Sequence, residues 1–185
     1  MNSKVASDLD ASAECFNRLV APKIEAHFHG RITRTEGSEC VGTDSMLDRL
    51  AGIDGWHIID SRGCVRGIAS RIQPCDRSWD TFTVRETRST GSETELAKRL
   101  RAIKETDAGW LFPALTAQAY VTMDRSALLS LGVVSTRDLY RFIEKGDRVV
   151  KKTNGEDGNT FLVVRFDDLR IFTSRLWTWP ENGAA

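Results

Sequence analysis

Three polar residues around a predicted β-hairpin have the types and spacing that phosphoryl chemistry needs. Asp54 stands just before a predicted strand over 56–60, and Arg71 and Gln73 alternate on one face of a second predicted strand over 65–73. Hydrolysis of a phosphodiester is assisted by a divalent metal that generates hydroxide and neutralises charge, and hard cations prefer carboxylate oxygens. Asp54, Arg71 and Gln73 are therefore candidate catalytic residues, with Asp54 as a candidate metal ligand.

The elements that must position these residues follow from changes in the hydrophobic period. A helix is expected over 8–27, and Pro22 should kink it because proline lacks an N–H. The pattern then predicts a loop or weak strand over 30–42, a short helix over 45–51, strands over 56–60, 65–73 and 81–87, a helix from the capping box Ser92-x-x-Glu95 to about Lys104, and a strand over 118–123.

The stretch Asp44-Ser45-Met46-Leu47-Asp48-Arg49-Leu50-Ala51-Gly52-Ile53-Asp54 resembles a pattern of the PD-(D/E)XK, or restriction-endonuclease-like, nucleases. In that superfamily an acidic helical segment leads into G-I-D, and the following hairpin carries (D/E)-X-K on its second strand. The resemblance implies an αβββαβ core over 8–123. Residues 124–185 are expected to form an α+β extension of the same single domain, with a helix at 136–144 and strands at 148–152 and 160–166.

This sequence departs from the superfamily pattern on the second strand, where Ala69 and Arg71 occupy the acid and lysine positions. Alanine cannot ligate a metal, and arginine stays ionised, which makes it a poor proton donor or acceptor. Gln73 could supply an amide oxygen. A relocated carboxylate could replace the missing acid, and the candidates are Glu14, Asp48, Asp60, Glu86 and Glu95, of which Glu14 and Asp48 are the preferred metal ligands beside Asp54.

Positive charge is concentrated between residues 62 and 104, although the whole chain has a formal net charge of zero. Ten lysines and arginines stand there against five acids, which can mark a surface that faces phosphate. The candidate nucleic-acid-binding residues are Arg71, Arg85, Arg88 and Lys98, although the helical spacing of Leu96, Leu100 and Ile103 predicts that Lys98 points away from the sheet.

Two functional hypotheses follow, and the sequence leaves both open. The first is a Mg²⁺-dependent endodeoxyribonuclease that hydrolyses DNA. The second is a catalytically inactive, nuclease-derived module that binds nucleic acid, a protein partner or a second copy of itself; an interaction subunit with only accidental similarity is a third possibility.

The spacing of the cysteines and the length of the apolar runs indicate in which cellular compartment the protein is expected. No C-x-x-C pair is present, which disfavours zinc, and Cys15, Cys40, Cys64 and Cys75 are expected to be reduced. No run of 18 apolar residues and no signal-peptide core occur, so a cytoplasmic protein without membrane contact is expected.

Overall fold

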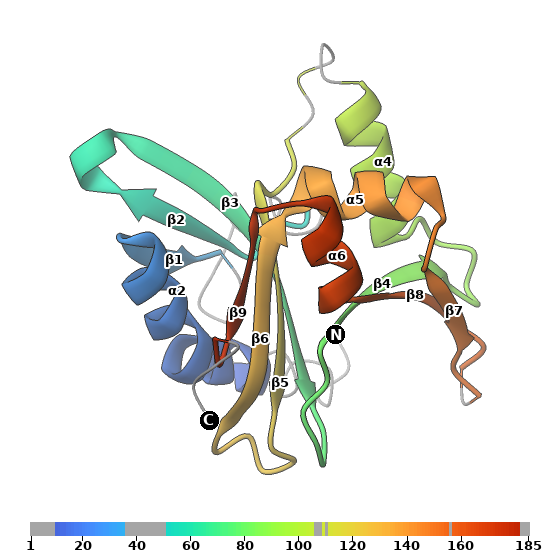
Figure 1. Ribbon diagram of the computed structural model, residues 1–185, viewed down its shortest axis with the longest axis horizontal. Helices are drawn as coiled ribbons and strands as arrows, with labels where there is room; N and C mark the ends of the chain where they lie inside the picture. The colour runs from blue at the N-terminus through green and yellow to red at the C-terminus, as the bar shows by residue number, and fades with distance from the viewer. Residues whose placement is uncertain (1–9, 36–50, 106–108, 110, 156, 182–185) are drawn as a thin grey trace.

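The computed structural model describes residues 10–35, 51–105, 109, 111–155 and 157–181, and it has a mixed α/β fold (Figure 1). The described residues form the strands β1 (Arg31–Arg34), β2 (Gly55–Ile59), β3 (Cys64–Pro74), β4 (Thr81–Thr87), β5 (Leu115–Val121), β6 (Leu128–Ser135), β7 (Val150–Thr153), β8 (Thr160–Arg165) and β9 (Leu176–Trp179). The helical segments are the π-helical turn Phe16–Val20, α2 (Ala21–Phe28), a 3-10 turn over Asp60–Arg62, α4 (Glu95–Lys104), α5 (Thr136–Lys145) and α6 (Phe166–Phe172).

The larger sheet is mixed and has six strands in the order β1-β2-β3-β5-β6-β9. The predicted hairpin is confirmed: β2 and β3 pair antiparallel, with Trp56 opposite Gly67, and they occupy the second and third positions of the sheet. β3 and β5 run parallel, with Arg71 opposite Gln118, and the chain between them contains β4 and α4. The hairpin therefore places Asp54 at the start of β2 and Arg71 in the middle of β3, on neighbouring strands.

The predicted strand over 81–87 forms, but its expected place beside the hairpin is wrong. β4 belongs to a separate antiparallel sheet in the order β4-β8-β7, where Phe82 lies opposite Val164. The weak strand expected within 30–42 is β1, which pairs with the free edge of β2 instead. The sequence did not predict this pairing because β8 lies about eighty residues after β4, beyond the reach of any local pattern.

The N-terminal helical segment covers one face of the larger sheet (Figure 1). Phe16, Val20 and Ile24 are buried against apolar residues of β3, β5 and β6. The helix is continuous from residue 10 to residue 28, and a π-helical turn immediately precedes Pro22. This wider turn accommodates the missing N–H of the proline, so the expected kink takes the form of a change in helical hydrogen bonding.

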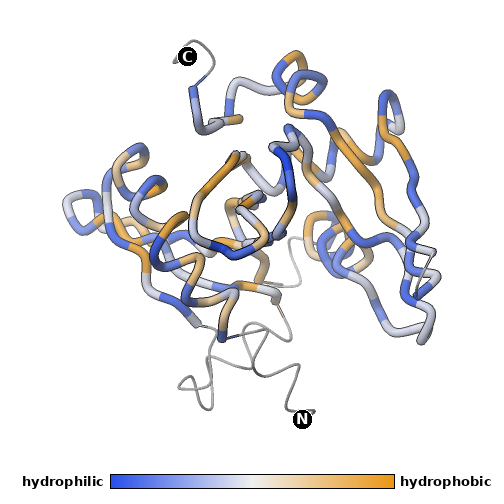
Figure 2. The backbone as a smooth tube through the Cα atoms, turned by 90° about the horizontal axis from the view of Figure 1, so that it is seen from below, coloured by the Kyte–Doolittle hydropathy of each residue, from blue (hydrophilic) through white to orange (hydrophobic). Residues whose placement is uncertain are grey.

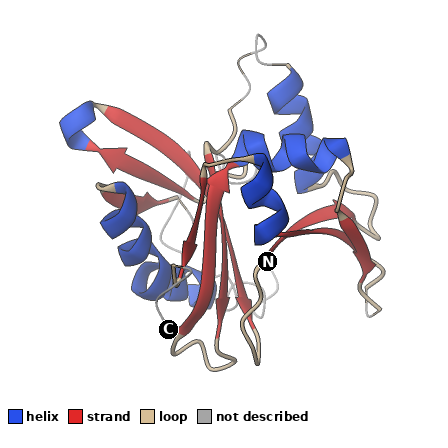
Figure 3. Cartoon of the chain, viewed as in Figure 1, coloured by secondary structure: helices blue, strands red, loops and turns tan. Residues whose placement is uncertain are grey.

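The opposite face of the larger sheet packs on the smaller sheet and on α5 and α6. Gly132 of β6 lies under two aromatic rings, and a Cβ there would come within 2.4 Å of the Phe166 ring, so only glycine permits this approach. Figure 2 shows the apolar segments running along the strands, with polar segments on the outer loops. Figure 3 shows the three later helices grouped on the side of the smaller sheet, away from α2.

Two of the sequence predictions, the lack of membrane contact and the reduced cysteines, concern features that the structure shows only in part. No helix in the described ranges has the length and apolar character needed to cross a bilayer. Cys15, Cys64 and Cys75 are free thiols, whereas Cys40 lies outside the described residues.

A buried histidine on β2 should make the stability of the fold depend on pH. His57 is fully buried, and burial, assisted by the positive charge of Arg66, lowers the pKa of its imidazole below the ordinary value. The neutral ring is therefore favoured in the folded state, so its contribution is complete above the unfolded pKa of about 6.5 and is lost as the pH falls. We expect the free energy of unfolding, measured with urea, to fall between pH 7.5 and pH 5, at most about 1.4 kcal/mol for each unit of pKa difference. His57→Phe should remove this part of the pH dependence, and an unchanged pH profile in that variant would contradict the assignment.

Candidate functional site

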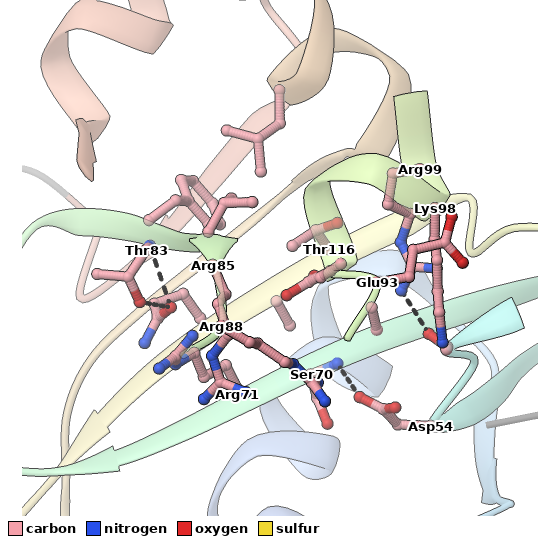
Figure 4. Close-up of a pocket in the computed structure, with 18 residues that line it drawn as sticks. Asp54, Ser70, Arg71, Thr83, Arg85, Arg88, Glu93, Lys98, Arg99 and Thr116 are labelled. Carbon is pink, nitrogen blue, oxygen red and sulfur yellow. Dashed lines mark hydrogen bonds between the residues drawn. The ribbon is translucent and has the colours of Figure 1, made fainter. Parts of the chain in front are cut away.

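The candidate site is a pocket between the two sheets, with a cavity volume of about 270 Å³. β3 and β5 form its floor, β4 forms one wall, and the start of α4 closes one end (Figure 4). The side chains that line it include five basic and three acidic residues, namely Arg71, Arg85, Arg88, Lys98, Arg99, Asp54, Glu93 and Glu95. The pocket thus brings together Asp54 and all four residues predicted to bind nucleic acid.

The Gly-Ile-Asp segment is held in place by a buried arginine of α4. Arg99 is 3% exposed, and its guanidinium donates hydrogen bonds to the carbonyl oxygens of Ala51 and Gly52, the latter at 2.7 Å. Gly52 has a positive φ of 57°, and a Cβ there would approach Arg99 to 2.5 Å, so the position requires glycine twice over. Ile53 is buried as well, so Asp54 enters the pocket from a fixed backbone.

The carboxylate of Asp54 faces the second strand of the hairpin. Its Oδ2 accepts a hydrogen bond from the backbone N–H of Ser70 (Figure 4), and the side chain is 9% exposed. This contact joins the G-I-D segment to the middle of β3, between Ala69 and Arg71. Asp54 therefore lies at the start of the hairpin and contacts its second strand.

Three guanidinium groups lie together on the other side of the pocket. Figure 4 shows Arg71 from β3 beside Arg85 and Arg88, which come from β4 and its end. None of the three forms an ion pair with a carboxylate in the described part of the chain. Arg71 and Arg85 instead lie over the ring of Phe161, at 5.0 Å and 5.5 Å from its centroid.

Burial of the pocket cations disfavours their charged form, as the pKa of Arg71 indicates. Burial lowers the pKa of its guanidinium, the charge of Glu95 acts in the opposite direction, and Arg85 lowers the pKa further. A cation in this position is stabilised by any anion that enters the pocket, because an anion restores the favourable charge interaction that water supplied.

The other two acidic residues of the pocket also have partners. Glu93 forms a two-pronged ion pair with Arg101, one contact of which is 3.2 Å, and Glu95 accepts a hydrogen bond from the hydroxyl of Tyr140 at 3.2 Å. Burial raises the pKa of Tyr140 well above its usual value, which keeps the hydroxyl protonated as a donor.

A buried amide on β5 adds a donor to the pocket lining. Gln118 is 1% exposed, and its Oε1 accepts hydrogen bonds from the backbone N–H and the hydroxyl of Thr83, at 3.4 Å and 3.1 Å. Because the backbone N–H can only donate, the oxygen must face Thr83, and the Nε2 of Gln118 is left without an acceptor among the described residues. An unmatched buried donor usually indicates a water or ligand that completes the site.

The described residues do not fit a resident magnesium ion. Mg²⁺ needs several oxygen ligands, but Ala69 supplies none, and the carboxylates of Glu93 and Glu95 are engaged by Arg101 and Tyr140. No group of three or more histidine, cysteine, aspartate or glutamate side chains suited to a metal occurs in the described ranges. The positive charge of the five basic side chains that line the pocket also repels a metal cation.

The remaining predicted site residues lie apart from this pocket. Gln73 is further along β3, outside the pocket lining, and Glu14 is exposed on the N-terminal helix. Asp60 pairs with Arg31 at 3.3 Å and Glu86 pairs with Lys151 at 2.7 Å, so among the described candidates for a relocated acid only Glu95 shares the pocket of Asp54. Asp48 lies outside the described residues.

The prediction that Lys98 points away from the sheet is wrong. Figure 4 shows its side chain extending from α4 toward the Gly52–Asp54 segment, and it lines the pocket. The apolar face of α4 packs against β4 and α5 rather than the larger sheet, so the opposite face is turned to the hairpin. Sequence reasoning also missed Arg99 and Gln118; the only signal for Gln118 is a single amide inside the apolar run L-T-A-Q-A-Y-V.

No protein-family model matches this sequence, and no match is found among curated proteins or solved structures. The function must therefore be argued from the pocket itself.

Proposed function

We propose that this protein binds the phosphate backbone of DNA in the pocket between its two sheets, as a nuclease-like module without metal-dependent cleavage. The observation that carries the proposal is the convergence of Arg71, Arg85 and Arg88, none of which forms an ion pair with a carboxylate of the described residues. Guanidinium groups present planar forks that match phosphate oxygens, and an anion bound among several of them offsets their mutual repulsion. The unmatched Nε2 of Gln118 adds a donor at the same place.

The order of elements supports the nuclease-like scaffold. Within the larger sheet and its helices, a helical segment, the meander β1-β2-β3, the helix α4 and the strand β5 follow in the helix, three strands, helix, strand order, with β4 of the smaller sheet inserted between β3 and α4. The third strand of the core would be β3 rather than β4. The restriction-endonuclease-like core is thus a proposal based on element order and on the G-I-D segment.

Metal-dependent hydrolysis of DNA is the second candidate function, and Asp54 is the observation that favours it. Its carboxylate shares the pocket with Arg71, Lys98 and Glu95, which are residue types suited to phosphoryl chemistry. The described residues do not complete a set of ligands for Mg²⁺, so we derive no hydrolytic step through a metal.

Asp54→Asn separates the two candidates. In a binding pocket this change removes a negative charge that repels phosphate, while the amide oxygen still accepts the N–H of Ser70. We expect DNA affinity, measured by fluorescence anisotropy, to rise about fivefold, the equivalent of about 1 kcal/mol of like-charge repulsion. Asp60→Asn, which removes an exposed carboxylate outside the pocket, should leave affinity unchanged.

The same proteins should be incubated with plasmid and single-stranded DNA in Mg²⁺ or Mn²⁺. We expect no cleavage by the wild type or by Asp54→Asn. Cleavage by the wild type that is lost in Asp54→Asn would overturn the binding-module proposal and favour the metal-dependent nuclease.

A further inference from the structure

The cations of the pocket continue onto a surface of the smaller sheet that the pocket itself does not use. In the register of this sheet, Phe161 of β8 lies between Arg85 of β4 and Lys152 of β7. Side chains of paired residues project from the same face of a sheet, so the three form one row across it. Phe161 is half-buried and Lys152 is exposed, so this row is open to a ligand.

The row leads to a second aromatic ring. The Nζ of Lys152 lies 5.8 Å from the centroid of Trp79, and the guanidinium of Arg77 lies 4.1 Å from the same centroid. Trp79 belongs to the connection between β3 and β4. The basic–aromatic strip therefore consists of Arg71, Arg85, Phe161, Lys152, Trp79 and Arg77.

The strip is held in place by hydrogen bonds around Trp79. The hydroxyl of Ser130 donates to the carbonyl of Trp79 at 2.7 Å, and the N–H of Phe166 donates to the carbonyl of Asp80 at 2.9 Å. These contacts tie the connection to both β6 and the start of α6. Trp79 is therefore a fixed platform, which lowers the entropy lost when a ligand stacks on it.

Glu86, the carboxylate next to Arg85 on β4, is directed away from the strip. Glu86 of β4 forms its ion pair with Lys151, and Lys151 and Lys152 are successive residues of one strand whose side chains point to opposite faces. The strip therefore alternates cations with aromatic rings. Such a surface suits a strand of nucleic acid whose phosphates meet the cations and whose bases stack on the rings.

We propose that the basic–aromatic strip binds single-stranded nucleic acid that continues from the pocket. Phosphates would contact Arg85, Lys152 and Arg77, and two bases would stack on Phe161 and Trp79. A duplex uses the faces of its bases in its own stack and cannot offer them to these rings, so the strip selects unpaired strands. This proposal rests on phosphate binding in the pocket, which anchors one end of the strand.

The test compares a fluorescein-labelled oligo(dT) strand with a hairpin duplex of equal phosphate number, by anisotropy at the same series of salt concentrations for both. We expect Trp79→Leu to weaken oligo(dT) binding about tenfold and to leave duplex binding unchanged. Phe161→Leu should weaken oligo(dT) binding more than duplex binding, because the Phe161 ring also contacts Arg71 and Arg85 of the pocket. Lys152→Gln, at an exposed position that does not threaten folding, should weaken oligo(dT) binding and lower its salt slope by about one. Trp177→Leu is the matched control, because Trp177 packs on the opposite core beside His27.

The outcomes separate this inference from the function on which it rests. If the wild type binds neither probe, both proposals fail. If the wild type binds the duplex and the variants bind oligo(dT) as well as the wild type, only the strip fails. Equal losses for both probes in Trp79→Leu and Phe161→Leu would also overturn selection of unpaired strands.

Discussion

Replacing Arg71 and Arg85 together by methionine should weaken DNA binding by about 100-fold or more. Each guanidinium is expected to make a charge-assisted contact with phosphate, and such contacts contribute about 1.5–3 kcal/mol each. Methionine keeps much of the apolar stem, so the contact with Phe161 is partly retained and the fold should persist. The loss should appear in anisotropy titrations, and the slope of log affinity against log salt should fall by about two.

The control for this experiment is the double variant Arg62→Met with Arg141→Met. Both residues are exposed and lie outside the pocket, so the same net charge is removed from elsewhere on the protein. We expect this control to change affinity less than threefold, as the general field alone would. Equal losses in the two double variants would mean that DNA senses only the overall charge, and the pocket would lose its assigned role.

Local patterns predicted the part of the fold that depends on neighbouring residues. The hairpin of β2 and β3 joins strands through a turn of a few residues, so period and turn chemistry were sufficient. The helix α4 begins close to its predicted capping box, although Thr94 rather than Ser92 provides the cap, through a 3.4 Å hydrogen bond from the N–H of Ala97. An error of two residues at a helix start is small for a prediction from spacing.

Partners that are distant in the sequence were not predictable in this way. β9 was not recognised as a strand, because it pairs with β6, about forty residues earlier in the chain. β6 and α6 were also missed, although β6 pairs with β5 directly before it and α6 directly follows β8. β4 has an ordinary strand pattern that says nothing about which sheet receives it. Only the apolar contacts of Phe82 and Val84 with α5 and β8 decide that choice.

In the candidate site, too, the residues placed by local structure were predictable and those placed by distant packing were not. Asp54 and Arg71 could be singled out from a short motif, because their separation is set by one hairpin. Lys98 and Arg99 depend on how α4 is rotated, which follows from its packing on β4 and α5. Their partners, the carbonyls of Ala51 and Gly52 for Arg99, are nearly fifty residues away, so no spacing rule connects them.

Arg99→Met should destabilise the fold by about 2–4 kcal/mol in urea unfolding. Burying a guanidinium has a desolvation cost, and replacing a buried ion pair by apolar residues is often neutral. Here, however, the acceptors are backbone carbonyls of residues 51 and 52, which stay in place when the arginine is removed. Unmatched buried carbonyls and lost charge-assisted hydrogen bonds therefore outweigh the relief of desolvation.

Arg101→Met, two residues after Arg99 on the same helix α4, is the matched control for Arg99→Met. Arg101 is partly exposed and pairs with Glu93 near the surface, where an ion pair contributes at most about 1 kcal/mol. Gly52→Ala should reproduce the loss seen in Arg99→Met, because a methyl group at φ 57° meets the Arg99 guanidinium. The double variant of Gly52→Ala and Arg99→Met should be less destabilised than the sum of the two single changes, since both disturb one contact. Full additivity would show that the two residues act independently, and that Arg99 does not hold the segment which brings Asp54 into the pocket.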